Sequence, residues 1–100
     1  MATRPTPRRT TTAAHTIGEQ LQAWRKLLGL TAQVVAERAG ISRSTLTRLE
    51  AGDVHVGLDT FLNVCLALGI LEGVTQATDP YETDFGRARA DQQLPKRVRA

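Results

Sequence analysis

The chain has few of the residues that build disulfide frameworks, metal centres and membrane spans. Its 100 residues include one cysteine, Cys65, and two histidines, His15 and His55. One thiol cannot form an intrachain disulfide, and one cysteine with two distant histidines is too small a set for a zinc site. The longest apolar run, residues 64–71, is far shorter than the roughly 20 residues that cross a bilayer. We therefore expect no metal, no cofactor and no membrane association.

Aromatic residues, strand patterns and catalytic motifs are scarce as well. Aromatic residues make up 4% of the chain, whereas its apolar fraction of 41% is close to that of an ordinary globular protein. β-branched residues do not alternate with polar residues over any long stretch, which disfavours strands. The sequence offers no Ser/His/Asp set, no carboxylate pair in a plausible cleft and no glycine-rich phosphate loop. The sequence thus predicts an all-α protein that is not an enzyme and binds no small molecule.

Basic charge is concentrated at the two ends of the chain. The formal net charge is +3, yet residues 16–71 hold five basic and five acidic side chains. Residues 1–15 carry three arginines and residues 95–100 carry three basic side chains, with no acid in either segment. Such ends attract phosphates in some proteins and are solvated tails in others, and charge patterning leaves both readings open.

Helix signals divide the chain into three parts. Residues 1–15 contain two prolines and no apolar periodicity, so they are predicted to be a disordered basic arm. Residues 16–71 are predicted to hold four helices, the first starting at a capping box of Thr16 and Glu19. Residues 72–100 are predicted to be a linker, a fifth helix starting at Asp79 and Pro80, and a basic tail.

Apolar periodicity also predicts which faces of these helices are buried. The expected inward residues of the first helix are Ile17, Leu21, Trp24 and Leu28. Those of the fourth helix, at 58–68, are Phe61, Val64, Cys65 and Leu68. Those of the fifth helix are Tyr81, Phe85 and Ala88.

A tight turn between two short helices is the most informative feature. Thr31 can cap a helix over residues 32–39, Gly40 ends it, and Ser42 can cap the next helix. The small residues around the turn let the two helices approach closely, and Ile41 can fill the angle between them. The outward face of the second helix carries Arg43, Ser44, Thr47 and Arg48. This arrangement is typical of a recognition helix in the major groove of DNA.

Several separated motifs resemble the Cro/Xre repressor family. They are LT at 30–31, AERAGIS at 36–42, LTRLEAG at 46–52, LDT at 58–60 and ALGI at 67–70. The resemblance covers about residues 17–70. It implies a compact four- to five-helix bundle, a lambda repressor-like DNA-binding domain. It also implies a cytoplasmic transcriptional regulator at the bacterial nucleoid, a repressor or autorepressor that binds a palindromic operator as a homodimer.

The resemblance assigns roles to single residues. Arg43, Ser44 and Arg48 would face base edges, and Thr45, Gln33 and the loop at 54–57 would approach phosphates. The family usually has glutamine where this chain has Ala32. The full set expected to contact double-stranded DNA is Gln33, Ser42, Arg43, Ser44, Thr45, Thr47, Arg48 and His55.

Two further residues match a structural feature of the family. Arg25 and Glu50 occupy the positions of an ion pair that is buried between the first and third helices. The alternative is that both are solvated surface charges.

Partner surfaces are suggested by the second half of the chain. Leu62 and Leu66 widen the apolar surface of the fourth helix, so either the fifth helix or a second subunit covers them. With Ile70 and Leu71 they form the expected dimer interface. The fourth helix followed by LGIL at 68–71, a helical linker region and the closing segment at 94–99 together resemble HipB-type antitoxins, which act beside HipA-type kinase toxins. The alternative function is therefore an antitoxin or adaptor that binds such a toxin or another protein.

Overall fold

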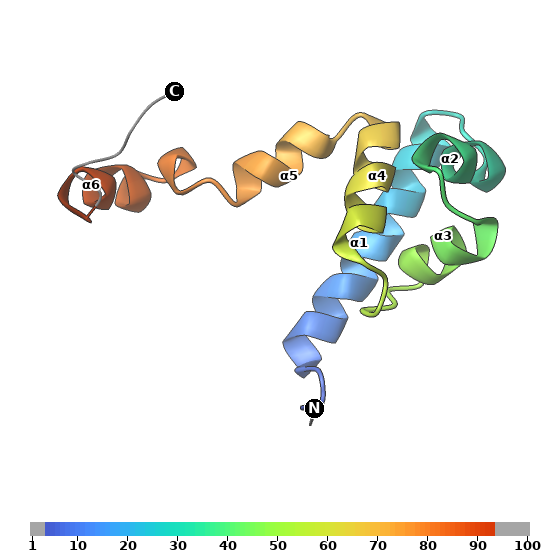
Figure 1. Ribbon diagram of the computed structural model, residues 1–100, viewed down its shortest axis with the longest axis horizontal. Coiled ribbons are helices and arrows are strands. Elements are labelled where there is room, and N and C mark those ends of the chain that lie inside the picture. Colours follow the sequence, from blue (N-terminus) through green and yellow to red (C-terminus); the bar gives the residue numbers. More distant parts are fainter. Residues whose placement is uncertain (1–3, 94–100) are drawn as a thin grey trace. The chain divides into compact units, whose positions relative to one another are not determined.

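The computed structural model describes residues 4–93, whose regular elements are all helices and which contain no strand. The helices are α1 (Arg8–Leu27), α2 (Ala32–Ala39), α3 (Arg43–Glu50), α4 (Leu58–Leu68), α5 (Leu71–Ala77) and α6 (Asp84–Gln93), with a 3-10 turn, η1 (Pro80–Glu82), before α6 (Figure 1). The all-α class is confirmed, and these residues form six helices where four or five were expected. None of the described helices is long and apolar enough to cross a membrane. Packing divides the chain between Ile70 and Leu71 into two units.

The first helix begins eight residues earlier than predicted. α1 starts at Arg8, so Thr16 and Glu19 lie inside it, and the predicted disordered arm is wrong for residues 8–15. Both prolines of this segment precede the helix, and the carbonyl of Pro7 accepts hydrogen bonds from the N–H groups of Thr10 and Thr11. Proline at a helix start costs no hydrogen bond, because the first N–H groups have no intrahelical partner.

Close backbone approaches hold α1 against the rest of the first unit. Gly18 is buried where a Cβ would overlap the carbonyl oxygen of Glu50 in α3. A Cβ on Gly52 would lie 2.8 Å from the Cα of His15. These glycine contacts place the N-terminal half of α1 beside the turn that comes after α3. Apolar periodicity does not reveal them, because glycine has no side chain to count.

The predicted bounds of α2 and α4 and the predicted start of α3 are confirmed, because these ends are set by local chemistry. Thr31 caps α2 by accepting a hydrogen bond from the N–H of Val34, and Ser42 caps α3 by accepting one from Thr45. Gly40 and Gly69 end α2 and α4 with φ of 70° and 79°. Positive φ values suit glycine, which has no Cβ to clash with the following carbonyl.

The core of the first unit is formed by small and branched apolar side chains from all four helices. The buried set is Leu21, Val35, Ala36, Ala39, Leu46, Leu49, Val64, Cys65 and Leu68. The predicted core of α4 is confirmed except at Phe61, which is only half-buried. The predicted face of α1 is wrong at Ile17, Trp24 and Leu28, which are exposed. Burial raises the pKa of the Cys65 thiol, as expected for a cysteine that packs as a small apolar residue.

The second unit differs from the prediction in its helix starts. The predicted linker at 72–78 is helical up to Ala77, as α5. Asp79 does act as a cap, because its side chain accepts a hydrogen bond from the N–H of Tyr81, but the capped element is the short turn η1. α6 begins after Thr83, whose hydroxyl accepts a hydrogen bond from the N–H of Gly86.

The predicted buried face of the last helix is also wrong. Phe85 is 72% exposed and Ala88 is exposed, whereas Ala90 is buried. The turn η1 takes Tyr81 out of the helix, so the three residues do not form one helical face. The predicted basic tail lies outside the described residues.

Candidate nucleic-acid interface

The turn between α2 and α3 has the geometry of a helix-turn-helix. The N–H of Gly40 bonds to the carbonyl of Glu37, and the N–H of Ile41 bonds to the carbonyl of Ala36. These bonds satisfy the last carbonyls of α2 and reverse the chain within a few residues. Ala36 and Ala39 are buried and Ile41 is half-buried at this turn. α3 therefore packs against α2 through small side chains, and its other face stays open.

An ion pair joins α1 to the last turn of α3. Arg25 donates from Nε to Glu50 Oε2 at 2.7 Å and from Nη2 to Oε1 at 3.0 Å. The two side chains are only 13% and 9% exposed. The hydrogen bond to Glu50 raises the pKa of Arg25. The expected pair is thus present and nearly buried, and it fixes α3 to the longest helix of the unit.

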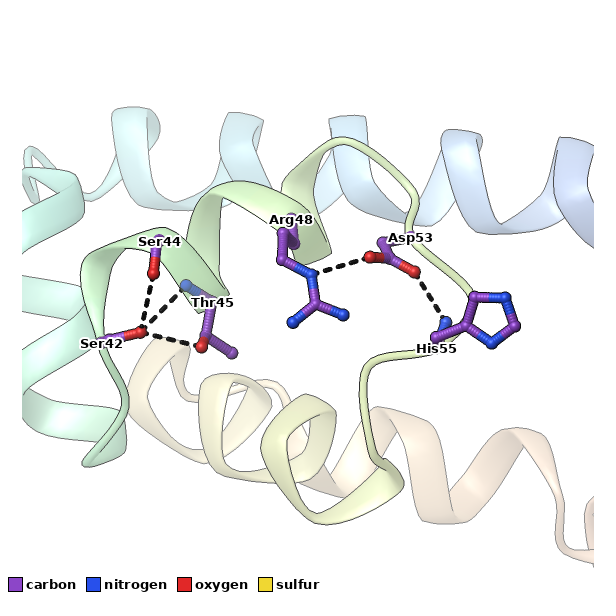
Figure 2. A network of polar contacts seen from close by, with 6 residues as sticks. All are labelled: Ser42, Ser44, Thr45, Arg48, Asp53 and His55. Atoms are coloured by element: carbon purple, nitrogen blue, oxygen red, sulfur yellow. Dashed lines mark hydrogen bonds and ion pairs between the residues drawn. The ribbon is translucent and has the colours of Figure 1, made fainter.

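Three hydroxyl groups are gathered at the N-terminus of α3. The Ser42 Oγ lies 3.1 Å from the Ser44 Oγ and 2.8 Å from the Thr45 Oγ1, and it accepts a hydrogen bond from the N–H of Thr45 (Figure 2). The first N–H groups of a helix and the positive end of its dipole favour anions. The start of α3 therefore combines hydroxyl and N–H donors at one exposed point.

The two arginines of α3 differ in how they are held. Arg43 is exposed, and its side chain makes no hydrogen bond or ion pair within residues 4–93. Arg48 donates from Nε to Asp53 Oδ2 at 2.8 Å, across the turn at Gly52. The Arg48 side chain is still 52% exposed. Figure 2 shows the other two guanidinium nitrogens of Arg48 without a dashed contact.

Asp53 is a polar residue of this surface that sequence reasoning missed. Its Oδ1 accepts a hydrogen bond from the N–H of His55 at 2.8 Å (Figure 2). This bond and the one from Arg48 lower the pKa of the Asp53 carboxyl. The sequence signal that could have identified it is its position, five residues after Arg48 and directly after Gly52.

The remaining predicted DNA contacts are exposed, but two of them already have partners. Gln33 in α2 donates from Nε2 to Glu37 Oε2 at 3.0 Å. The Thr47 hydroxyl donates to the carbonyl of Arg43 at 3.0 Å, which leaves its oxygen as an acceptor and its methyl group free. The His55 side chain is exposed in the loop between α3 and α4.

The predicted dimer residues are unevenly exposed. Leu66 is 64% exposed on α4, whereas Leu62 and Ile70 are half-buried. Leu71 is half-buried at the first position of α5.

A basic stretch of α1 lies near the loop between α3 and α4. Thr10 and Ala14 line a shallow groove together with Val54 and Val56 of that loop. Arg8 and Arg9 are exposed in the same first turns of α1. The positive charge that was expected on a disordered arm is thus carried in part by a helix.

Comparison with known proteins agrees with this geometry. Residues 16–77 match the family model described as a helix-turn-helix domain, which covers well over half of the chain. No curated protein and no solved structure matches the chain. The match includes the whole α2–turn–α3 unit and both residues of the ion pair. The chain therefore belongs to the helix-turn-helix domain family.

Proposed function

We propose that the protein is a sequence-specific regulator of transcription that binds double-stranded DNA through α3. The observation that carries this proposal is the exposed face of α3, where Arg43 and Arg48 stand on a helix that the Arg25–Glu50 pair fixes in place. Arginine forms paired hydrogen bonds to the O6 and N7 atoms of guanine, and it can do so with discrimination only from a rigid support. The free methyl group of Thr47 suits contact with thymine.

Contacts to the phosphate backbone would surround this face. The hydroxyl groups and N–H groups at the start of α3 form one candidate phosphate site, and the His55 loop forms a second. Gln33 is a weaker candidate, because its amide N–H group is directed to Glu37. These contacts would set the position of α3 in the groove without reading sequence.

A homodimer on a palindromic site completes the proposal. One short helix reads few base pairs, so two copies related by a two-fold axis would double the contact. The interface we propose includes Leu66, the most exposed of the predicted residues, with Leu62, Ile70 and Leu71. A dimer seated on a promoter excludes other proteins from it, which makes repression the proposed outcome. The antitoxin alternative depends in part on residues 94–99, which lie outside the described part of the chain.

Selection from a pool of randomised duplexes tests this function. We expect the purified chain to enrich an inverted repeat whose half-site centres are about 10 base pairs apart. Sedimentation of the free protein at micromolar concentration should show a dimer. Enrichment of no motif would contradict sequence-specific binding, and a single half-site bound by a monomer would contradict the dimer.

The basic start of α1 should add electrostatic affinity without adding specificity. Replacing Arg4, Arg8 and Arg9 with glutamine keeps the helix and removes three charges. If each arginine contacts one phosphate, the salt slope of binding to a random duplex should fall by about 2.7, from about 0.9 per contact. Substitution is preferred to deletion here, because His15 packs against Gly52. Binding titrations at several salt concentrations measure the slope.

The matched control for this prediction removes three other exposed charges, with glutamine at Lys26, Arg38 and Arg89. The control has the same net charge and should change the slope far less. Equal slopes for the two triple variants would mean that the start of α1 does not contact DNA.

A further inference from the structure

We infer that Asp53 is a positioning residue, which holds the Arg48 guanidinium for base recognition and weakens binding to DNA of other sequences. This inference rests on the proposed function and deepens it. Asp53 does not need to touch DNA for this role, because it would act through Arg48. The tether would make α3 selective, since it restricts the arginine that reads sequence.

The position of the Asp53 carboxylate is fixed by three hydrogen bonds. The N–H of Asp53 donates to the carbonyl of Arg48 at 3.0 Å, so the backbone returns to the end of α3. Gly52, with φ of 86°, makes this return possible. The carboxylate then accepts from Arg48 Nε and from the N–H of His55, each at 2.8 Å (Figure 2). Arg48 and Asp53 are thus joined twice, once by backbone and once by side chain.

The tether leaves the base-reading edge of the guanidinium available. Asp53 takes the Nε–H, and both Nη groups have no partner within the described residues. The two Nη groups can therefore donate in parallel to the O6 and N7 acceptors of one guanine. A long arginine side chain normally samples many rotamers, and a side chain already held in one direction loses less freedom when it binds.

The same carboxylate should oppose binding through phosphates alone. Its charge cancels that of Arg48, and a phosphate that approaches the pair meets a negative group beside the positive one. The pair adds little to folding, because Arg48 is half exposed and exposed ion pairs contribute little stability. Removing the carboxylate should thus release Arg48 to swing toward the nearest phosphate.

Asp53→Asn separates the tether from the structure of the loop. The asparagine carbonyl can still accept from the N–H of His55, whereas its NH₂ group cannot accept from Arg48 Nε. Glu19→Gln is the matched control. It also removes one negative charge from the first unit, and the exposed Glu19 side chain on α1 makes no hydrogen bond or ion pair within residues 4–93.

The experiment is selection from the randomised duplex pool with the full chain and four variants, followed by titrations on one random duplex. The variants are Arg48→Ala, Asp53→Asn, their double variant and Glu19→Gln. Arg48→Ala identifies the base position that Arg48 reads. Asp53→Asn should reduce the preference at that position alone by about fivefold, the low end for a bidentate contact. It should also bind the random duplex more tightly, with a salt slope steeper by about 0.9.

Three results would overturn the inference. One is that Asp53→Asn keeps the wild-type preference at the base position that Arg48 reads. Another is that Asp53→Asn reduces the base preference as much in the presence of Arg48→Ala as it does alone, because Asp53 would then act independently of Arg48. The third is that Glu19→Gln increases the affinity for the random duplex as much as Asp53→Asn does. If the wild-type chain enriches no motif at all, the proposed function fails and the inference fails with it, whereas a motif insensitive to Asp53 removes only the inference.

Discussion

Replacing Arg25 with alanine should lower the free energy of unfolding by about 3–5 kcal/mol. The loss comes from Glu50, which keeps its charge when its partner is removed. Glu50 is 9% exposed and accepts both of its charged hydrogen bonds from Arg25, so the variant would leave a nearly buried carboxylate without a cation. Small domains have total stabilities of about 5–15 kcal/mol, so this loss is a large share of the whole. Urea or thermal denaturation followed by circular dichroism measures it.

Two further variants show whether the loss belongs to the pair. Arg38→Ala removes an arginine that is exposed on α2, and it should change stability by no more than about 0.5 kcal/mol. Replacing Arg25 with methionine and Glu50 with leucine together should recover most of the loss, because no unpaired charge remains. If Arg25→Ala were as mild as Arg38→Ala, the pair would contribute nothing to the fold.

The parts of the fold that depend on local chemistry could be predicted from the sequence. Thr31, Gly40 and Ser42 determine the bounds of α2 and α3 through hydrogen bonds between residues only a few positions apart. The Arg25–Glu50 pair could be anticipated only by resemblance, since its members are 25 residues apart. The exposed face of α3 could be inferred from its apolar periodicity, because the inward Leu46 and Leu49 fix the opposite face.

The start of α1 could not be predicted, because the contacts that support it lie far away in the sequence. Threonine, arginine and proline in residues 1–15 suggest disorder, and nothing local contradicts that interpretation. In the structure, Gly52 gives this part of the helix a surface on which His15 packs. Similarly, the Asp79–Pro80 signal correctly marked a cap, but only tertiary context decides whether a 3-10 turn or an α-helix comes after it.

The side-chain partners within the candidate site could not be predicted from the sequence either. The residues of α3 could be placed on its exposed face, but hydrogen bonds such as Arg48–Asp53 and Gln33–Glu37 depend on rotamers. The first of these pairs further requires the positive φ at Gly52. The sequence therefore identifies the exposed surface of α3, but it does not show which of its hydrogen-bond donors already have a partner within the protein.

The double variant with Arg43→Ala and Arg48→Ala should lose about 2–6 kcal/mol of binding free energy on the selected duplex, since each bidentate arginine–guanine contact is worth about 1–3 kcal/mol. On a random duplex the loss should be small, because most of that affinity comes from phosphate contacts elsewhere on the surface. Neither arginine contributes to the core, so the variant should keep the melting temperature of the parent. This prediction separates base reading from electrostatic attraction.

The most direct test of base recognition by α3 is one ratio, the affinity for the selected duplex divided by the affinity for a random duplex. It should be measured at several salt concentrations for the parent chain and for the Arg43→Ala, Arg48→Ala double variant. We expect the parent to show a high ratio at every salt concentration and the double variant to show a ratio near one. If both duplexes weaken equally in the double variant, so that the ratio stays at the parent value, α3 is not the helix that reads sequence.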